Sequence, residues 1–309
     1  MRKTWTHCLY CGCSYPPGEL SREHVFPDAF GARLRLPEGA VCRQCNNILN
    51  REIDQKLNAM FDPVLAYFGI ESEKRPGDSA GRVIVETTEE QYRARIRKGG
   101  GVRRPSLQRL RRFETEVPEG TRVREVWQGS VDEMERIVDL RRSQWEEFRM
   151  EVGPTAPIQR IGAPLTGSWD TLIRTAARAA INYLGYRRPA DAVRCTLSDA
   201  KAYVVKGPSE DGRHLTALGP KELAVKPGAV LSVAEMMKPI HRIAVGSHGQ
   251  GILQCGVVLF DLIWTRVVLT RSWDGDVFYA EEEFNAEAGE SRHIDRGFIH
   301  PNAFKIVTP

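Results

Sequence analysis

The chain has 309 residues, 41% of them hydrophobic and 27% charged, and its formal net charge is +4. This length predicts two domains, one small and one larger, and the apolar fraction allows a real hydrophobic core. The most apolar stretch, residues 251–270, contains Asp261 and Arg266, which argues for a buried β-hairpin and against a membrane span. The modest positive charge permits a nucleic-acid partner without requiring one.

Two Cys-x-x-Cys pairs, Cys8/Cys11 and Cys42/Cys45, stand near the start of the chain. Each pair places two thiolates on one tight turn, and Zn²⁺ prefers four soft ligands in a tetrahedron. A site closed by four thiolates has no open position, so we expect a structural zinc, which contributes about 10–16 kcal/mol in small peptides. A disulfide pair or a redox motif is the alternative. Cys13 is close enough in sequence to replace Cys11, but Cys-x-x-Cys on both sides is the commoner geometry.

The start of the chain and its other cysteines fit a reducing compartment. Met1-Arg2-Lys3 is followed by polar residues and not by the apolar run of a secretory signal, so we expect a cytoplasmic protein. Cys195 and Cys255 stand in apolar surroundings and are expected to be buried thiols. Core or surface roles, and not metal binding, are expected for the three histidines without ligand-like spacing: His241, His248 and His293.

Polar residues of the types used in catalysis and metal binding lie between and after the cysteine pairs. The segment Glu23-His24-Val25-Phe26 has the β-branched and aromatic content of a short strand. Because neighbouring strand residues point to opposite faces, Glu23 and His24 should diverge unless a bend or loop intervenes. Prolines and glycines predict a loop over residues 27–39. The apolar spacing predicts a helix over residues 43–60, on which Asn46, Asn50 and Asp54 recur every four residues and share one face.

The pattern Cys-x-x-Cys, Glu-His-Val-x-Pro, Cys-x-x-Cys-Asn-Asn resembles the HNH endonucleases, specifically the branch with a four-cysteine zinc and an acidic residue before the histidine. The resemblance is direct over residues 5–57. Members of this family build a ββα-metal (His-Me finger) motif: a strand with the catalytic histidine, a loop, a second strand and a helix with a metal ligand. The implied fold class is α+β, with an N-terminal zinc-stabilised ββα-metal module followed by a larger mixed α+β domain.

The resemblance also implies roles for individual residues. His24 matches the general base that activates water, and Glu23 matches the acidic ligand of a single catalytic cation. Asn46 matches the helix ligand of that cation, and Asn50 matches a second helix position that some members use. These residue types suit phosphodiester hydrolysis, because histidine accepts a proton near pH 7 and oxygen ligands suit Mg²⁺ or Mn²⁺. We interpret Asp54 as a helix-surface acid without a role.

The chain departs from the family pattern in the loop. An asparagine that often steadies the catalytic histidine in the family has no counterpart, since no Asn occurs between His24 and Asn46; a backbone carbonyl could orient the ring instead. This absence supports one alternative, a non-catalytic zinc-containing module that binds nucleic acid or protein. An RNA-directed nuclease is the other alternative, because one cation and one histidine do not distinguish sugars.

The most basic part of the chain follows this module. Residues 93–112 contain nine Lys or Arg and no acidic residue, with Gly99-Gly100-Gly101 in the middle. Such a stretch suits a surface that tracks a nucleic-acid backbone, although a solvated hairpin would have the same composition. Our candidate nucleic-acid contacts are Arg22, Arg43, Arg93, Arg95, Arg97, Lys98, Arg103 and Arg104.

Further elements follow from local patterns. The capping box of Ser130 and Glu133 predicts a helix to about residue 150. The apolar spacing after Ser168 predicts a helix to residue 185, and another is expected to start near Pro189. Connectors are predicted over residues 62–68, 71–81 and 153–164. Strands are predicted over residues 82–86, 91–97, 241–245, 252–260, 262–270 and 276–280.

We therefore divide the chain into an HNH module (residues 1–70), a basic hairpin and helix for nucleic-acid contact (71–153), and an α+β domain without an assigned role (154–309). The hypothesis is a metal-dependent endonuclease that hydrolyses DNA, with a structural Zn²⁺ and a catalytic Mg²⁺ or Mn²⁺. By analogy with the family, restriction or phage defence would be its setting. Because a ββα motif makes one nick, a homodimer or an activating partner protein would fit such an enzyme.

Overall fold

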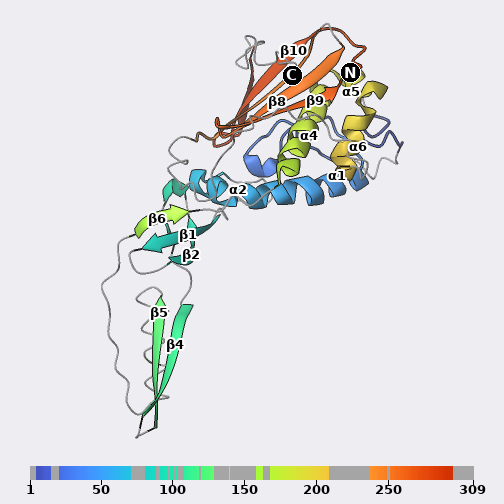
Figure 1. Cartoon of the computed structure of the whole chain (residues 1–309). Coiled ribbons are helices and arrows are strands. Elements are labelled where there is room, and N and C mark those ends of the chain that lie inside the picture. Colours follow the sequence, from blue (N-terminus) through green and yellow to red (C-terminus); the bar gives the residue numbers. More distant parts are fainter. Residues whose placement is uncertain are drawn as a thin grey trace, which may run out of the picture.

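The computed structural model describes residues 5–14, 21–70, 81–87, 91–96, 98–100, 102–103, 108–117, 120–128, 139, 158–162, 168–208, 237–248 and 251–294. The predicted helix over residues 130–150 and the predicted linker over residues 71–81 lie outside these ranges except for residues 139 and 81. Within the described ranges the chain is α+β, as expected, with helices and antiparallel sheets (Figure 1).

The N-terminal module is a short antiparallel backbone pair followed by a helix. His24 forms an antiparallel bridge with Arg35, and backbone hydrogen bonds of 2.8 Å flank the bridge on both sides. The 3-10 turn η2 (Asp28–Phe30) lies between the paired segments and ends at Gly31, which has a left-handed φ of 73°. The predicted strand around His24 is thus present as a single bridge.

One long helix follows in three segments, α1 (Arg43–Leu49), the π-helical η3 (Asn50–Asp54) and α2 (Gln55–Phe68). The sulfur of Cys42 caps its start by accepting the amide of Cys45. The predicted connector over residues 62–68 is wrong, because the helix continues through Pro63 and buries Phe61 and Val64 in the core. It ends at Gly69, whose φ of 65° closes the last turn.

Shorter helices pack beside the long one. Ser168 caps α4 (Trp169–Arg187) by accepting the Thr171 amide at 3.2 Å, as the sequence predicted, and the helix runs two residues beyond the predicted end. The expected short helix α5 (Pro189–Ala192) follows. A 3-10 turn, η5 (Cys195–Leu197), then leads into α6 (Ser198–Lys206), which the sequence analysis did not predict.

A five-stranded antiparallel sheet covers α4 (Figure 1). Its strand order is β11-β10-β7-β8-β9. The predicted hairpin over residues 251–270 is confirmed as β8 paired with β9, joined through Phe260 and Asp261, which both have positive φ. The strands are β7 (Ile240–His248), β8 (Ile252–Leu259), β9 (Ile263–Thr270), β10 (Tyr279–Asn285) and β11 (Glu290–His293).

Two smaller sheets stand next to the long helix and beyond it (Figure 1). The predicted hairpin after residue 81 is confirmed as β1 (Gly81–Thr87) paired with β2 (Gln91–Ile96), with β3 (Val102–Arg103) at one edge. β6 (Ile158–Gly162) pairs with β1, so the predicted linker over residues 153–164 is wrong in its middle. A separate two-stranded ribbon consists of β4 (Gln108–Val117) and β5 (Gly120–Gln128).

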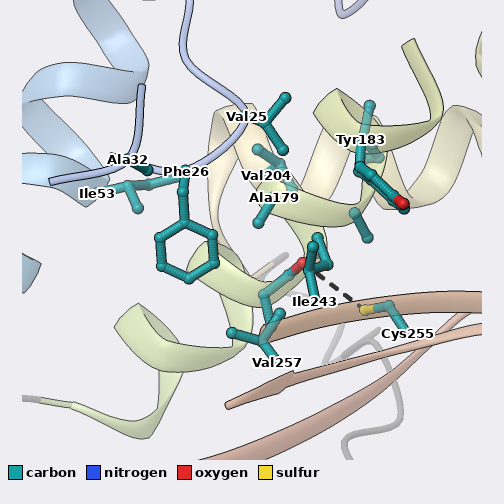
Figure 2. Packing of buried hydrophobic residues seen from close by; sticks show 14 of the residues in the cluster. Val25, Phe26, Ala32, Ile53, Ala179, Tyr183, Val204, Ile243, Cys255 and Val257 are labelled. Carbon is teal, nitrogen blue, oxygen red and sulfur yellow. Dashed lines mark hydrogen bonds between the residues drawn. The ribbon is translucent and has the colours of Figure 1, made fainter. Parts of the chain in front are cut away.

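A single hydrophobic cluster joins the N-terminal module to the five-stranded sheet. Figure 2 shows Val25 and Phe26 of the module facing Ala179 of α4 and Val257 of β8. The Cys255 thiol donates to the carbonyl of Ala176, 3.6 Å away. The module is therefore packed on the C-terminal part of the chain and does not have a core of its own.

Candidate active site and zinc centre

Four cysteine sulfurs converge at the start of the module. The Sγ atoms of Cys8, Cys11, Cys42 and Cys45 all lie within 4.8 Å of one another, and those of Cys11 and Cys42 are 3.9 Å apart. Tetrahedral zinc with Zn–S bonds of about 2.3 Å places its sulfurs about 3.8 Å apart. Backbone amides of Cys42 and Cys45 donate to sulfurs of the cluster at 3.4 Å. The spacing and these donors fit one zinc ion.

The state of the cysteines agrees with this assignment. All seven are free, so the disulfide alternative is not realised in the structure. A hydrogen bond from the Cys45 thiol, together with backbone donors, lowers the pKa of Cys8 to about 4. Cys13 is exposed and lies outside the cluster, and Cys255 is buried as expected. The prediction for Cys195 is wrong: its side chain is exposed at the start of η5, where Leu197 fills the core instead.

Glu23 lies in a buried network that reaches helix α4. Its Oε1 accepts hydrogen bonds from Arg178 Nε at 2.9 Å and Asn182 Nδ2 at 3.2 Å, and it also pairs with Arg178 Nη2. Nη1 of the same guanidinium binds Oδ1 of Asp54. The Tyr10 hydroxyl donates to Asn182 Oδ1 at 2.7 Å. The side chains of Glu23 and Arg178 are each 4% exposed, so water has little access to their ion pair.

Burial and charge together set the protonation of this network. Burial raises the pKa of Glu23, an effect that the charge of Arg178 opposes and that of Asp54 reinforces. Burial alone would lower the pKa of Arg178, but the two carboxylates more than offset it and raise that pKa. Arg178 therefore stays charged.

His24 contacts a different set of partners from Glu23, as expected for neighbouring strand residues. Its ring Nε2 accepts a hydrogen bond from Arg35 Nε at 3.1 Å and lies 3.9 Å from Asp28 Oδ1. A ring nitrogen that accepts a hydrogen bond holds a lone pair, so the proton of the neutral ring is on Nδ1. The backbone carbonyl of His24 accepts Asn182 Nδ2 at 2.8 Å. Arg35 thus contacts the ring, and Asn182 fixes the main chain.

The candidate asparagines lie at the start of the long helix. Asn46 in α1 is partly buried, and Asn50, the first residue of the π-helical segment, is exposed. A π-helical segment inside an α-helix is rare and is frequently found at functional sites. Asp54 ends this segment and binds Arg178, so the interpretation of Asp54 as a surface acid without a role is wrong.

The predicted nucleic-acid contacts are only partly within the described residues. Arg22 and Arg43 are exposed, and Arg22 Nε lies 3.8 Å from Glu38 Oε1. Lys98 pairs with Glu287 at 2.8 Å. Arg93 and Arg95 lie in β2 and Arg103 in β3, whereas Arg97 and Arg104 fall outside the described residues.

Sequence reasoning missed Arg178 and Asn182, which contact Glu23 from a position more than 150 residues away. The apolar spacing predicts their helix but says nothing of its polar positions. Two large polar residues four apart, Arg178 and Asn182, share one face of a helix that is otherwise buried. Because a buried charge and a buried amide each need hydrogen-bond partners, this pair of residues indicates a buried polar contact.

The N-terminal module is similar to one known protein family. Residues 8–62 match the family model described as HNH endonuclease. No curated protein and no solved structure matches the chain. Among the described residues, no helix has the length and apolar character needed to cross a bilayer. The segment of residues 8–62, which contains the four clustered cysteines, is thus similar to the HNH endonucleases.

Proposed function

We propose that this protein is a metal-dependent endonuclease that hydrolyses DNA phosphodiester bonds. The observation that carries the proposal is the match of residues 8–62 to the HNH endonucleases. The backbone bridge between His24 and Arg35, the intervening loop and the following helix have the order of a ββα motif, which supports the same interpretation.

His24 is the proposed general base. Its Nε2 lone pair is oriented by the hydrogen bond from Arg35 Nε at 3.1 Å, and it accepts the proton of the attacking water once a phosphate draws the guanidinium away. Arg35 then contacts the phosphate, which suits the planar fork of arginine. Exposed Arg22 and Arg43 remain our proposed phosphate contacts at the edge of the module.

Glu23 and Asn46 are the proposed ligands of the catalytic cation, with Asn50 as a further helix position. Their carboxylate and amide oxygens suit Mg²⁺ or Mn²⁺. When bound, such a cation stabilises charge on the phosphoryl oxygens and on the leaving 3′ oxygen. In this proposal the strand that carries His24 supplies the Glu23 oxygen, and the long helix supplies the oxygens of Asn46 and Asn50.

Residues 93–112 are the proposed electrostatic contact with DNA. The stretch has nine Lys or Arg and no acidic residue, and two of them, Arg93 and Arg95, belong to β2. Such a concentration of positive charge suits contact with the phosphates of a nucleic-acid backbone.

The test is nicking of supercoiled plasmid by zinc-loaded protein, first with Mg²⁺ and then with Mn²⁺. We expect wild type to nick and His24→Ala to lose at least about 100-fold in rate, as removal of a general base does. His293→Ala, which removes an exposed histidine of β11, is the matched control and should cut as wild type does. Equal nicking by wild type and His24→Ala would reject His24 as the base. An RNA substrate, assayed in parallel, tests the RNA-directed alternative.

One observation favours a second function, that of a non-catalytic zinc-containing module that binds nucleic acid. Glu23 is almost fully buried, and its Oε1 is already bound by Arg178 and Asn182. If wild type and His24→Ala both shift DNA on a gel and neither cuts it with either cation, this second function replaces the first.

A further inference from the structure

We propose that Arg178 and Asn182, on helix α4, are positioning residues for Glu23 and His24, so that the C-terminal part of the chain completes the nuclease site. The inference rests on the proposed function, because it takes Glu23 as a cation ligand. It assigns to helix α4 a role that neither the family match, which ends at residue 62, nor the sequence pattern of the module contains.

The two carboxylate oxygens of Glu23 differ in their contacts. Oε1 accepts from Arg178 Nε at 2.9 Å and from Asn182 Nδ2 at 3.2 Å, and it pairs with Arg178 Nη2. Among the described residues, every hydrogen bond to the Glu23 carboxylate ends on Oε1. Three donors on one oxygen fix the plane of the carboxylate and leave Oε2 as the oxygen for a cation.

Arg178 is itself held from the other side. Its Nη1 binds Oδ1 of Asp54, at the end of the π-helical segment. The guanidinium thus ties the strand of Glu23 to the helix that carries Asn46, the other proposed ligand. A planar fork held at both ends sets the distance between strand and helix, which a single flexible ammonium would not do.

Asn182 joins the two functional residues of the strand. Its Nδ2 donates both to Glu23 Oε1 at 3.2 Å and to the backbone carbonyl of His24 at 2.8 Å. The Tyr10 hydroxyl donates to Asn182 Oδ1 at 2.7 Å, which fixes the amide with Nδ2 toward the strand. Because Glu23 and His24 point to different partners, one amide that holds both keeps their relative orientation constant.

Partners that orient a metal ligand without touching the metal typically change metal affinity or activity by about 10–100-fold when removed. A merely structural pair would change the stability of the fold and leave the cation affinity of the folded protein unaltered. A measurement of cation affinity therefore distinguishes a positioning role from a merely structural one.

The experiment is titration of Mn²⁺ into the zinc-loaded full chain, followed by the electron paramagnetic resonance signal of free Mn²⁺. Asn182→Leu removes both amide bonds but leaves the Glu23–Arg178 pair intact, and Tyr10→Phe removes only the group that orients the amide. We expect the Kd for Mn²⁺ to rise about 10–100-fold in Asn182→Leu and by a smaller factor in Tyr10→Phe.

The matched control is Arg174→Gln. Arg174 is as buried as Arg178 and lies one turn earlier on α4, but it donates to the backbone carbonyl of Val204 at 2.8 Å and not to the site. Its loss should destabilise the fold and leave the Kd unchanged. Arg178→Lys keeps the charge but loses the fork, and we expect it to weaken Mn²⁺ binding as Asn182→Leu does.

The outcomes separate this inference from the proposed function. Wild-type affinity in folded Asn182→Leu, or no Mn²⁺ binding by wild type, overturns the inference. Tighter binding by Arg178→Lys also overturns it, since the guanidinium would then compete with the cation for Glu23. If wild type binds Mn²⁺ but does not cut DNA, the proposed function fails, while the affinities of the variants still decide the positioning role.

Discussion

At the scale of single residues, His241 shows how an ionisable side chain becomes part of an apolar core. Its ring is fully buried, stacks on Phe26 with centroids 5.6 Å apart and meets Phe260 edge-on at 4.7 Å. Nδ1 accepts the backbone amide of Phe260 at 3.2 Å. Of the core or surface roles expected for His241, the structure has the core role, and this residue links the loop after His24 to the five-stranded sheet.

The burial of His241 predicts a loss of stability in acid. Burial lowers its pKa from the usual 6.5 to about 3, so the folded state stays neutral while the unfolded chain takes up a proton below pH 6.5. The stabilising effect is complete above pH 6.5 and is lost as the pH falls toward 3, by up to about 1.4 kcal/mol per pH unit.

The measurement for His241 is urea unfolding between pH 8 and pH 4. His241→Asn keeps an acceptor for the Phe260 amide but does not titrate, so its free energy of unfolding should be lower than that of wild type at pH 8 and should fall less steeply with acid. Parallel pH profiles for the two proteins would show that other groups cause the acid sensitivity.

At the scale of elements, the long helix from Arg43 to Phe68 is attached to the zinc centre at its start. Cys42 is its N-cap and Cys45 lies in its first turn, while Cys8 and Cys11 come from the preceding turn. The ion would therefore fix the helix that carries Asn46 against the segment before the His24 strand.

Removal of one zinc ligand should loosen this attachment. In Cys45→Ser we expect less than one zinc per chain and loss of a large part of the roughly 10–16 kcal/mol that a structural zinc contributes. Cys13→Ser is the control: Cys13 is exposed and outside the cluster, so zinc content should stay at one and stability within about 0.5 kcal/mol. Native mass spectrometry and thermal melting measure both. A full zinc complement in Cys45→Ser would mean that Cys13 takes its place.

The sequence predicted the elements that depend on interactions between residues close together in the chain. The zinc cysteines, the Ser168 cap of α4 and the β8–β9 hairpin follow from spacing, capping and apolar runs, and the structure has them. β6 and the ion pair of Glu23 with Arg178 depend on partners far along the chain, so no short window of sequence contains their cause. The continuation of the helix through Pro63 was missed because tertiary burial of Phe61 and Val64 outweighs the local signal of a proline.

At the scale of the whole molecule, the module and the C-terminal sheet share one core. Phe30 of the loop meets Phe260 of the β8–β9 turn with ring centroids 5.6 Å apart, and Figure 2 shows Val25 and Phe26 facing α4 and the sheet. The backbones also approach closely, since a Cβ on Gly31 would lie 2.2 Å from the carbonyl oxygen of Ala286. A domain boundary was predicted at residue 70, but the hydrophobic cluster contains residues from both sides of it.

This shared core predicts that residues 1–70 do not form a stable domain alone. Without α4 and the sheet, the fragment would expose the apolar side chains of Val25, Phe26 and Phe30 to water and would lose the contacts of Glu23 with Arg178 and Asn182. We expect the fragment to bind one zinc through its four cysteines but to melt without a cooperative transition. The Val25 and Leu36 amides, which donate to Leu34 and Glu23 beside the His24 bridge, should exchange rapidly in the fragment, whereas the full chain melts cooperatively and protects both amides. Circular dichroism and hydrogen exchange measure these properties. A cooperative transition with protected amides in the fragment would show that zinc alone folds the module, and the C-terminal part would then act on Glu23 and His24 only by docking onto a finished structure.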